Sequence, residues 1–130
     1  FVGIEISSGD SEKQTLIEKL RKSFEVLDMS DNSMAKTHIR YMVGGHANAE
    51  NEVIYRFEFP ERPGALLNFL KKIKTKWNIS LFHYRNHGAD FGRVLIGLQA
   101  DNVAELESRF DELGYYYKNE TDNKAYQYFL

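Results

Sequence analysis

The alternation of apolar and polar side chains is clearest in the middle of the chain, where it predicts a strand. Between residues 53 and 59 every second side chain is large and apolar, which is typical of a strand with one buried face. The next stretch changes to the spacing of one helix face, with apolar side chains at Leu66, Phe69, Leu70, Ile73 and Trp77. Two further strands are predicted over residues 79–85 and 94–98. Gly88 and Gly92 lie between them and favour a hairpin.

A second helix and an aromatic tail complete this pattern. Apolar positions at Val103, Leu106, Phe110 and Leu113 predict a helix that ends at Gly114. Residues 115–130 are rich in tyrosine and predict an edge strand or a pair of short strands. The resulting order is βαββαβ. It predicts an α+β fold of the ferredoxin-like type, in which an antiparallel sheet carries both helices on one face.

The first third of the chain repeats only the end of this plan. FVGIEIS, residues 1–7, predicts a buried strand followed by a helix, as does RVLIGLQ at 93–99. DMSDN at 28–32 precedes a predicted strand in HIRYM, as NETDN at 119–123 precedes YQYFL. We therefore divide the chain into the C-terminal half of one repeat with its linker, residues 1–47, and a complete repeat, residues 48–130.

A half repeat leaves a sheet edge and part of a helix-facing surface without cover. We expect another chain, or the completed repeat, to cover them. The chain also begins without a methionine and enters a strand pattern at once, which favours a piece cut from a longer protein.

Composition narrows the class of function. A chain of 130 residues with 42% hydrophobic and 28% charged residues is typical of a soluble globular protein with one domain or two very small ones. The formal net charge of −2 gives no electrostatic reason to expect nucleic acid or an anionic membrane as a partner. The chain has no cysteine, which excludes disulfides and thiolate chemistry. No stretch predicts a membrane span or a signal segment, so we expect a cytoplasmic protein.

Both prolines of the chain fall in FEFPERPGALLNFL, residues 57–70. Pro60 suits the end of a strand and Pro63 suits the first turn of a helix. Gly64 has no side chain, which lets a ligand approach the backbone closely. The unpaired N–H groups of a helix start favour a carboxylate. Two interpretations remain open at this point: the loop only starts a helix, or it also forms half of a pocket.

Other candidate chemistry is weak. His83 and His87 have i, i+4 spacing, but no carboxylate or thiolate cluster accompanies them, so we expect no metal site. No serine or histidine has the context of a catalytic nucleophile, and no phosphate-binding loop follows the glycines. We therefore expect no catalytic residue in this chain.

Four strings together resemble a known family. They are MAKTHIRYMVGG at 34–45, YRFEFPERPGALLNFL at 55–70, WNISLFHYRNHGADFGRVL at 77–95 and the tail from 112 to 130. They are similar to the C-terminal regulatory domain of biosynthetic threonine deaminase (threonine dehydratase), which consists of two ACT-like subdomains. The resemblance implies that a catalytic domain with pyridoxal phosphate lies upstream and that this chain itself holds no cofactor. It also implies a homo-oligomeric, tetrameric enzyme.

In that family the regulatory domain binds isoleucine, which inhibits, and valine, which counteracts the inhibition. The resemblance implies the same task here and places effector-binding residues at Pro63, Gly64, Ala65, Leu66, Leu70, Tyr84, Arg85 and Asn86. The corresponding half-pocket of the first repeat is not in the sequence. From the pattern alone, Leu66 and Leu70 are better explained as core, and Tyr84 can be explained as a contact with a neighbouring sheet.

Two alternatives come from other classes. An RNA-binding domain shares the βαββαβ order, and ADFGRVLIG at 89–97 has a faint similarity to its third strand. That strand lacks the expected aromatics, since it carries Val94, Leu95 and Ile96. A stand-alone ACT-type amino-acid sensor is the second alternative, and FHYRNHG favours threonine deaminase over it. Assembly of subunits is a further role that the pattern leaves open.

Overall fold

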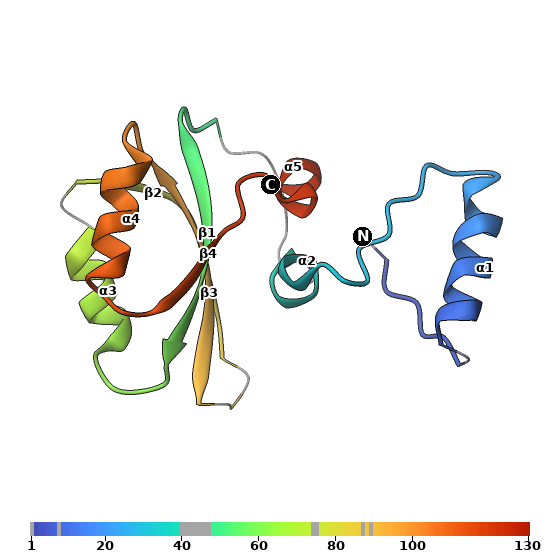
Figure 1. Ribbon diagram of the computed structural model, residues 1–130, viewed down its shortest axis with the longest axis horizontal. Helices are drawn as coiled ribbons and strands as arrows, with labels where there is room; N and C mark the ends of the chain where they lie inside the picture. Colours follow the sequence, from blue (N-terminus) through green and yellow to red (C-terminus); the bar gives the residue numbers. More distant parts are fainter. Residues whose placement is uncertain (1, 8, 40–47, 74–75, 87, 89) are drawn as a thin grey trace.

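The computed structural model describes residues 2–7, 9–39, 48–73, 76–86, 88 and 90–130. Its centre is a four-stranded antiparallel sheet in the order β2-β3-β1-β4. The strands are β1 (Glu52–Pro60), β2 (Asn78–Arg85), β3 (Phe91–Gln99) and β4 (Tyr116–Asn119). Helices α3 (Ala65–Ile73) and α4 (Val103–Asp111) lie together on one face of the sheet (Figure 1). The predicted ferredoxin-like arrangement of ACT domains is confirmed.

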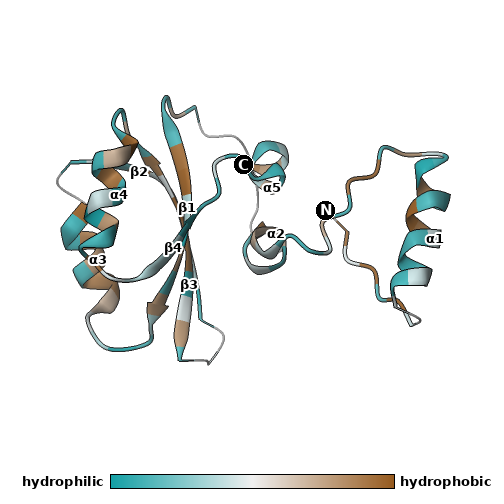
Figure 2. Cartoon of the chain, viewed as in Figure 1, coloured by the Kyte–Doolittle hydropathy of each residue, from teal (hydrophilic) through white to brown (hydrophobic). Residues whose placement is uncertain are grey.

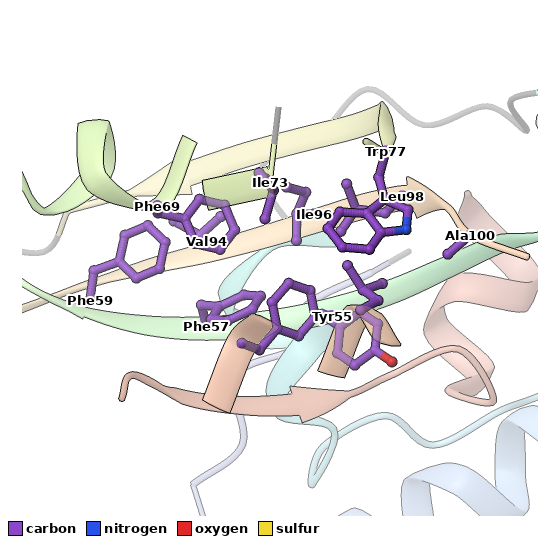
Figure 3. Packing of buried hydrophobic residues seen from close by; sticks show 12 residues of the cluster. Tyr55, Phe57, Phe59, Phe69, Ile73, Trp77, Val94, Ile96, Leu98 and Ala100 are labelled. Carbon is purple, nitrogen blue, oxygen red and sulfur yellow. The ribbon is translucent and has the colours of Figure 1, made fainter. Parts of the chain in front are cut away.

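The main core lies between this sheet and α3 and α4, as the alternation in β1 predicts. Tyr55, Phe57 and Phe59 are buried on the helix side, and Phe57 contacts both Phe69 and Phe110 in edge-to-face geometry. Figure 3 shows aromatic and aliphatic side chains of the strands and helices interdigitating in this layer. Each such side chain contributes about 1.5–3 kcal/mol by leaving water.

A register shift in β2 between Ile79 and Leu81 turns its side chains around. Ile79 packs on the main core, whereas Leu81 packs on the opposite face of the sheet. From there on the two faces alternate again, since Tyr84 pairs with Val94 of the helix-covered face. The shift therefore decides to which face of the sheet each side chain of FHYR, residues 82–85, points.

The opposite face of the sheet is covered by two short helices, α2 (Ser33–Thr37) and α5 (Lys124–Phe129). Their apolar side chains form a second core with strand residues: Met34, Ala35, Ile39, Ile54, Leu95, Ala125 and Leu130. The tail is therefore one edge strand followed by a helix. The predicted edge strand is confirmed, and the alternative of a second short strand in YQYFL was wrong. A helix satisfies its own backbone groups, so the tail can bury its apolar side chains on the sheet without a strand beside it.

The turns before α2 and α5 have the same local geometry. In both DMSDN and NETDN the N–H of the third residue donates to the side-chain oxygen of the first, over 2.9 and 3.0 Å. The last residue, Asn32 or Asn123, then caps the helix through its side chain. The two asparagines also meet, because Asn32 Nδ2 donates to Asn123 Oδ1 over 2.7 Å.

The first third of the chain departs from its predicted strands. Residues 2–7 form no strand, and Val2 is 79% exposed. Helix α1 (Asp10–Arg21) forms as expected and stands apart from the sheet (Figure 1). His38 and Ile39 are not in a strand, and the rest of HIRYM lies outside the described residues. A strand needs a neighbour for its backbone hydrogen bonds, and the residues described here provide none for FVGIEIS.

The extended stretches on either side of α1 nevertheless contain hydrophobic residues (Figure 2). Figure 2 shows them in the extended stretches beside α1, where no sheet covers them. Among the described helices, none is long and apolar enough to cross a membrane.

Candidate functional site

The loop between β1 and α3 is fixed by backbone hydrogen bonds. Glu61 N donates to Asp90 O over 2.8 Å, which ties the loop to the start of β3. Gly64 has a φ of +88°, a backbone conformation that residues other than glycine rarely adopt. The helix begins at Ala65, so Pro63 and Gly64 precede its first turn. Ala65 N donates to Arg62 O over 3.2 Å and Asn68 N to Gly64 O over 2.8 Å, so the N–H groups between them, at Leu66 and Leu67, remain for a ligand beside this loop.

Tyr84 connects β2 to this loop. Its hydroxyl donates a hydrogen bond to Glu61 Oε1, and this bond raises the pKa of Tyr84. The ring lies on Gly92 of β3, where an added Cβ would be 2.8 Å from Tyr84 Cε2. Gly92 therefore permits the close approach that lets Tyr84 reach Glu61. The structure brings Tyr84 and the proline-glycine loop to the same end of the helix-covered face.

The predicted helix residues have mixed surroundings. Ala65 is buried, and Leu66 and Leu70 are half-buried and pack against the main core. Both interpretations of these leucines thus find support, since part of each side chain belongs to the core and part stays accessible to a ligand. Neither of the two cavities described below includes any predicted effector residue.

Arg85 and Asn86 are not brought to this end of the helix-covered face. Arg85 Nη1 donates to Thr37 O over 3.3 Å, so its side chain reaches α2 on the opposite face of the sheet. Asn86 Oδ1 accepts from Gly88 N over 2.6 Å and stabilises the hairpin turn. Side chains of neighbouring strand residues point to opposite faces, which separates Arg85 from Tyr84.

Glu61 was missed by sequence reasoning. It is the only carboxylate between the two prolines, and that position was the available indication. Its partner Tyr84 is 23 residues away, so no local pattern indicates the contact. No local pattern indicates the contact between His38 and His83 either, because the two residues are 45 positions apart in the sequence.

Two cavities lie on the side of the sheet opposite α3 and α4. They are lined by residues of the first third of the chain and by residues of the C-terminal tail that contact it. The smaller, of about 370 Å³, is lined by Asp28, Asp31, Asn32, Ser33, Lys118, Glu120 and Asn123. The larger, of about 710 Å³, is mostly apolar and runs between the N-terminal segment, α1 and the end of α5. In the described part of the chain no group of three or more His, Cys, Asp or Glu side chains is placed to hold a metal ion. His87 lies outside that part.

The sheet face used for base stacking in RNA-binding βαββαβ domains is occupied here. It carries Ile54 and Leu95, which are fully buried under α2 and α5. Exposed aromatic side chains on the open face are required for stacking. The covered sheet face therefore disfavours the RNA-binding alternative.

The βαββαβ sheet and the proline-glycine loop at its first helix define an ACT-type domain. A family model described as the C-terminal regulatory domain of Threonine dehydratase matches residues 43–130, and the chain belongs to this family.

Curated relatives agree with this assignment. L-threonine dehydratase biosynthetic IlvA of Haemophilus influenzae is 49% identical over 133 residues, which cover all of this chain and 26% of the relative. The protein of the same name from Escherichia coli gives the same identity and coverage. Mitochondrial threonine dehydratase of Saccharomyces cerevisiae is 50% identical over 91% of this chain and 21% of its own length. The chain thus spans about a quarter of the length of these relatives.

Proposed function

We propose that this chain is the allosteric regulatory domain of a pyridoxal-phosphate-dependent threonine ammonia-lyase, and that it binds isoleucine as inhibitor and valine as activator. The observation that supports an effector site best is the proline-glycine loop at the start of α3, held to β2 by the hydrogen bond between Tyr84 and Glu61.

This arrangement offers the three kinds of contact that a branched amino acid needs. The N–H groups of Leu66 and Leu67, in the first turn of α3, suit its carboxylate. The Glu61 carboxylate, of which one oxygen accepts from Tyr84, suits its ammonium group. The accessible parts of Leu66 and Leu70 suit its side chain, whose full burial contributes about 1.5–3 kcal/mol.

Isoleucine and valine differ by one methylene. An apolar slot separates such ligands only by roughly ten- to two-hundredfold in affinity. Opposite effects of the two amino acids therefore require different sites or different states of the protein, rather than a tighter fit.

The division of the chain into residues 1–47 and 48–130 belongs to the same proposal. The matching turns and the contact between Asn32 and Asn123 support two related halves. The apolar cavity beside α1 is the surface that the remaining strands of a complete first subdomain would cover.

The enzyme as a whole is a proposal that rests on the relatives, which are about four times as long. Pyridoxal phosphate does not fit the residues described here, because one cavity is mostly apolar and the other carries three carboxylates against one lysine. We therefore assign the cofactor to the catalytic domain, which would supply the lyase chemistry in a cytoplasmic homo-oligomer.

Titration calorimetry with isoleucine, valine and leucine tests the function. We expect isoleucine to bind the full-length protein, and this chain more weakly. Tyr84→Ala and Leu66→Ala should each weaken binding about tenfold or more, since each removes part of one wall. Leu67→Ala and Tyr116→Ala are matched controls, because both side chains are exposed and lie outside the candidate site.

Two outcomes separate the parts of the proposal. Absence of isoleucine and valine binding to the full-length protein would overturn the effector function. Unchanged binding in both Tyr84→Ala and Leu66→Ala would overturn the placement of the site and leave the domain assignment standing.

A further inference from the structure

A pair of histidines joins the first third of the chain to the sheet. His38, at the C-terminal end of α2, and His83, in β2, have their Nδ1 atoms 2.8 Å apart. The rings meet edge to face, with centroids 5.1 Å apart. One Nδ1–H therefore donates to the lone pair of the other Nδ1. Arg85 strengthens the same junction, because it donates to Thr37 O at the end of α2.

The surroundings disfavour added positive charge. His38 is fully buried, and its Nε2 has no hydrogen-bond partner. Arginines face the pair from three neighbouring strands: Arg56 on β1, Arg85 on β2 and Arg93 on β3. Glu120 and Glu58 lie against Arg56 and Arg93, so their charges are already compensated by these arginines. Ala125 of α5 and Leu130 after it are buried in this layer and apolar. Tyr126 of α5 packs against the same cluster, and its hydroxyl donates to Glu52 Oε2 over 2.5 Å.

The joined and the separated histidines bind different numbers of protons. The contact exists only while one Nδ1 keeps its lone pair, so the joined rings accept at most one proton between them. Two separated imidazoles accept one proton each, with an ordinary pKa near 6.5. The separated state therefore binds more protons than the joined state at acidic pH, and acid favours separation.

We propose that the His38–His83 pair is a pH-sensitive latch, which holds α2 and the chain before it on β2 while the pair is neutral and releases them on acidification. His83 is next to Tyr84, whose side chain points to the opposite face. The latch thus lies directly behind the strand that carries the candidate effector residue.

The sign of the pH dependence follows from the described contacts. Burial, with His83 and the arginines as further causes, lowers the pKa of His38 to about 3, and burial together with Arg85 lowers the pKa of His83. A histidine whose pKa is lowered when α2 lies on β2 stabilises that state. This stabilisation is complete at a pH above the pKa of the released histidine. The stabilisation is then lost as the pH falls from about 6.5 towards 3.

Hydrogen exchange and NMR titration test the latch. The double variant His46→Asn/His87→Asn leaves the pair as the only histidines, so every remaining imidazole signal belongs to it. We expect two signals that titrate below the ordinary range and influence each other. Amide protection in α2, corrected for intrinsic exchange, should fall between pH 7 and pH 5 with a slope that approaches about ten- to a hundredfold per pH unit below 6.5, because the separated state binds one to two more protons.

The variant His83→Asn keeps a polar side chain at a half-exposed position and removes one of the two titrating groups. It should reduce the pH dependence of α2 protection to that of His38 alone, whose burial still lowers its pKa, while protection in α4 stays as in the parent chain. His38→Gln gives the complementary comparison at the buried position. The latch is refuted if both histidines titrate independently near 6.5, or if α2 protection has the same pH dependence in His83→Asn as in the parent chain.

Discussion

At the scale of single residues, Gly92 decides where Tyr84 lies. The ring of Tyr84 rests on this glycine, and an added Cβ would come within 2.7 Å of its hydroxyl oxygen. Only a residue without a side chain leaves the hydroxyl free to reach Glu61. The candidate site therefore depends on a residue that contacts no ligand in our proposal.

Gly92→Ala is expected to displace Tyr84 and weaken isoleucine binding. Gly97→Ala is the matched control, because its Cβ would also come too close to its neighbours, at 2.7 Å from Ser80 Oγ and 2.8 Å from Glu52 Oε1, but away from the candidate site. Both variants should lose about 1–3 kcal/mol of unfolding free energy from overpacking. Calorimetry should then show weaker isoleucine binding for Gly92→Ala alone. Equal binding by the two variants would contradict the role of Tyr84.

Glu120 is a buried charge that organises the junction of β4 and α5. It is 3% exposed, lies 3.2 Å from Arg56 Nε and accepts from Asn123 Nδ2 over 2.6 Å. Glu120→Ala leaves Arg56 without its counter-ion and is expected to cost about 3–5 kcal/mol in urea unfolding. Glu58→Ala breaks the half-exposed pair with Arg93 and should cost less than about 1 kcal/mol. Similar losses for both variants would contradict the buried pair.

At the scale of elements, two short helices are stable because each is capped and packed against the other. An isolated helix of five or six residues is not stable in water. Asn32 and Asn123 cap α2 and α5 and also bond to each other, so one pair of side chains serves both helices. The second core cluster then buries the apolar side of both.

A double-mutant cycle measures this coupling. Asn32→Ala and Asn123→Ala should each cost about 1–2 kcal/mol through the lost cap. The double variant should cost less than the sum of the two, with a coupling energy of about 0.5–3 kcal/mol. Asn102→Ala removes the exposed cap of α4 and should add independently to either variant. Strict additivity of Asn32→Ala and Asn123→Ala would contradict the shared junction.

At the scale of the whole molecule, the sheet with α3 and α4 is complete, and the segment around α1 is not. Among its described residues only Ile17 of α1 is buried, and Val2 and Ile4 are mostly exposed. Figure 1 shows α1 on the far side of α2 and α5 from the sheet. Local stability should therefore differ strongly between the two parts.

Hydrogen exchange of this chain is expected to show early exchange in α1 and late exchange in β1 and β3. In the full-length protein α1 should gain protection, because the rest of the first subdomain would cover the apolar cavity beside it. Fast exchange of α1 in both proteins would argue against the two-subdomain division. The sheet in the same samples serves as the internal control.

The sequence by itself determined the βαββαβ part, because each element there has its own periodicity and its own end signals. The alternation of Tyr55, Phe57 and Phe59 and the Pro63-Gly64 start of α3 are local patterns that the fold follows. The family followed from the same strings. Only the tertiary structure decided that residues 2–7 find no strand to pair with among the described residues and that the tail after residue 119 turns into a helix. It alone paired Glu61 with Tyr84 and His38 with His83, because such contacts depend on the order of strands and the side on which each helix packs.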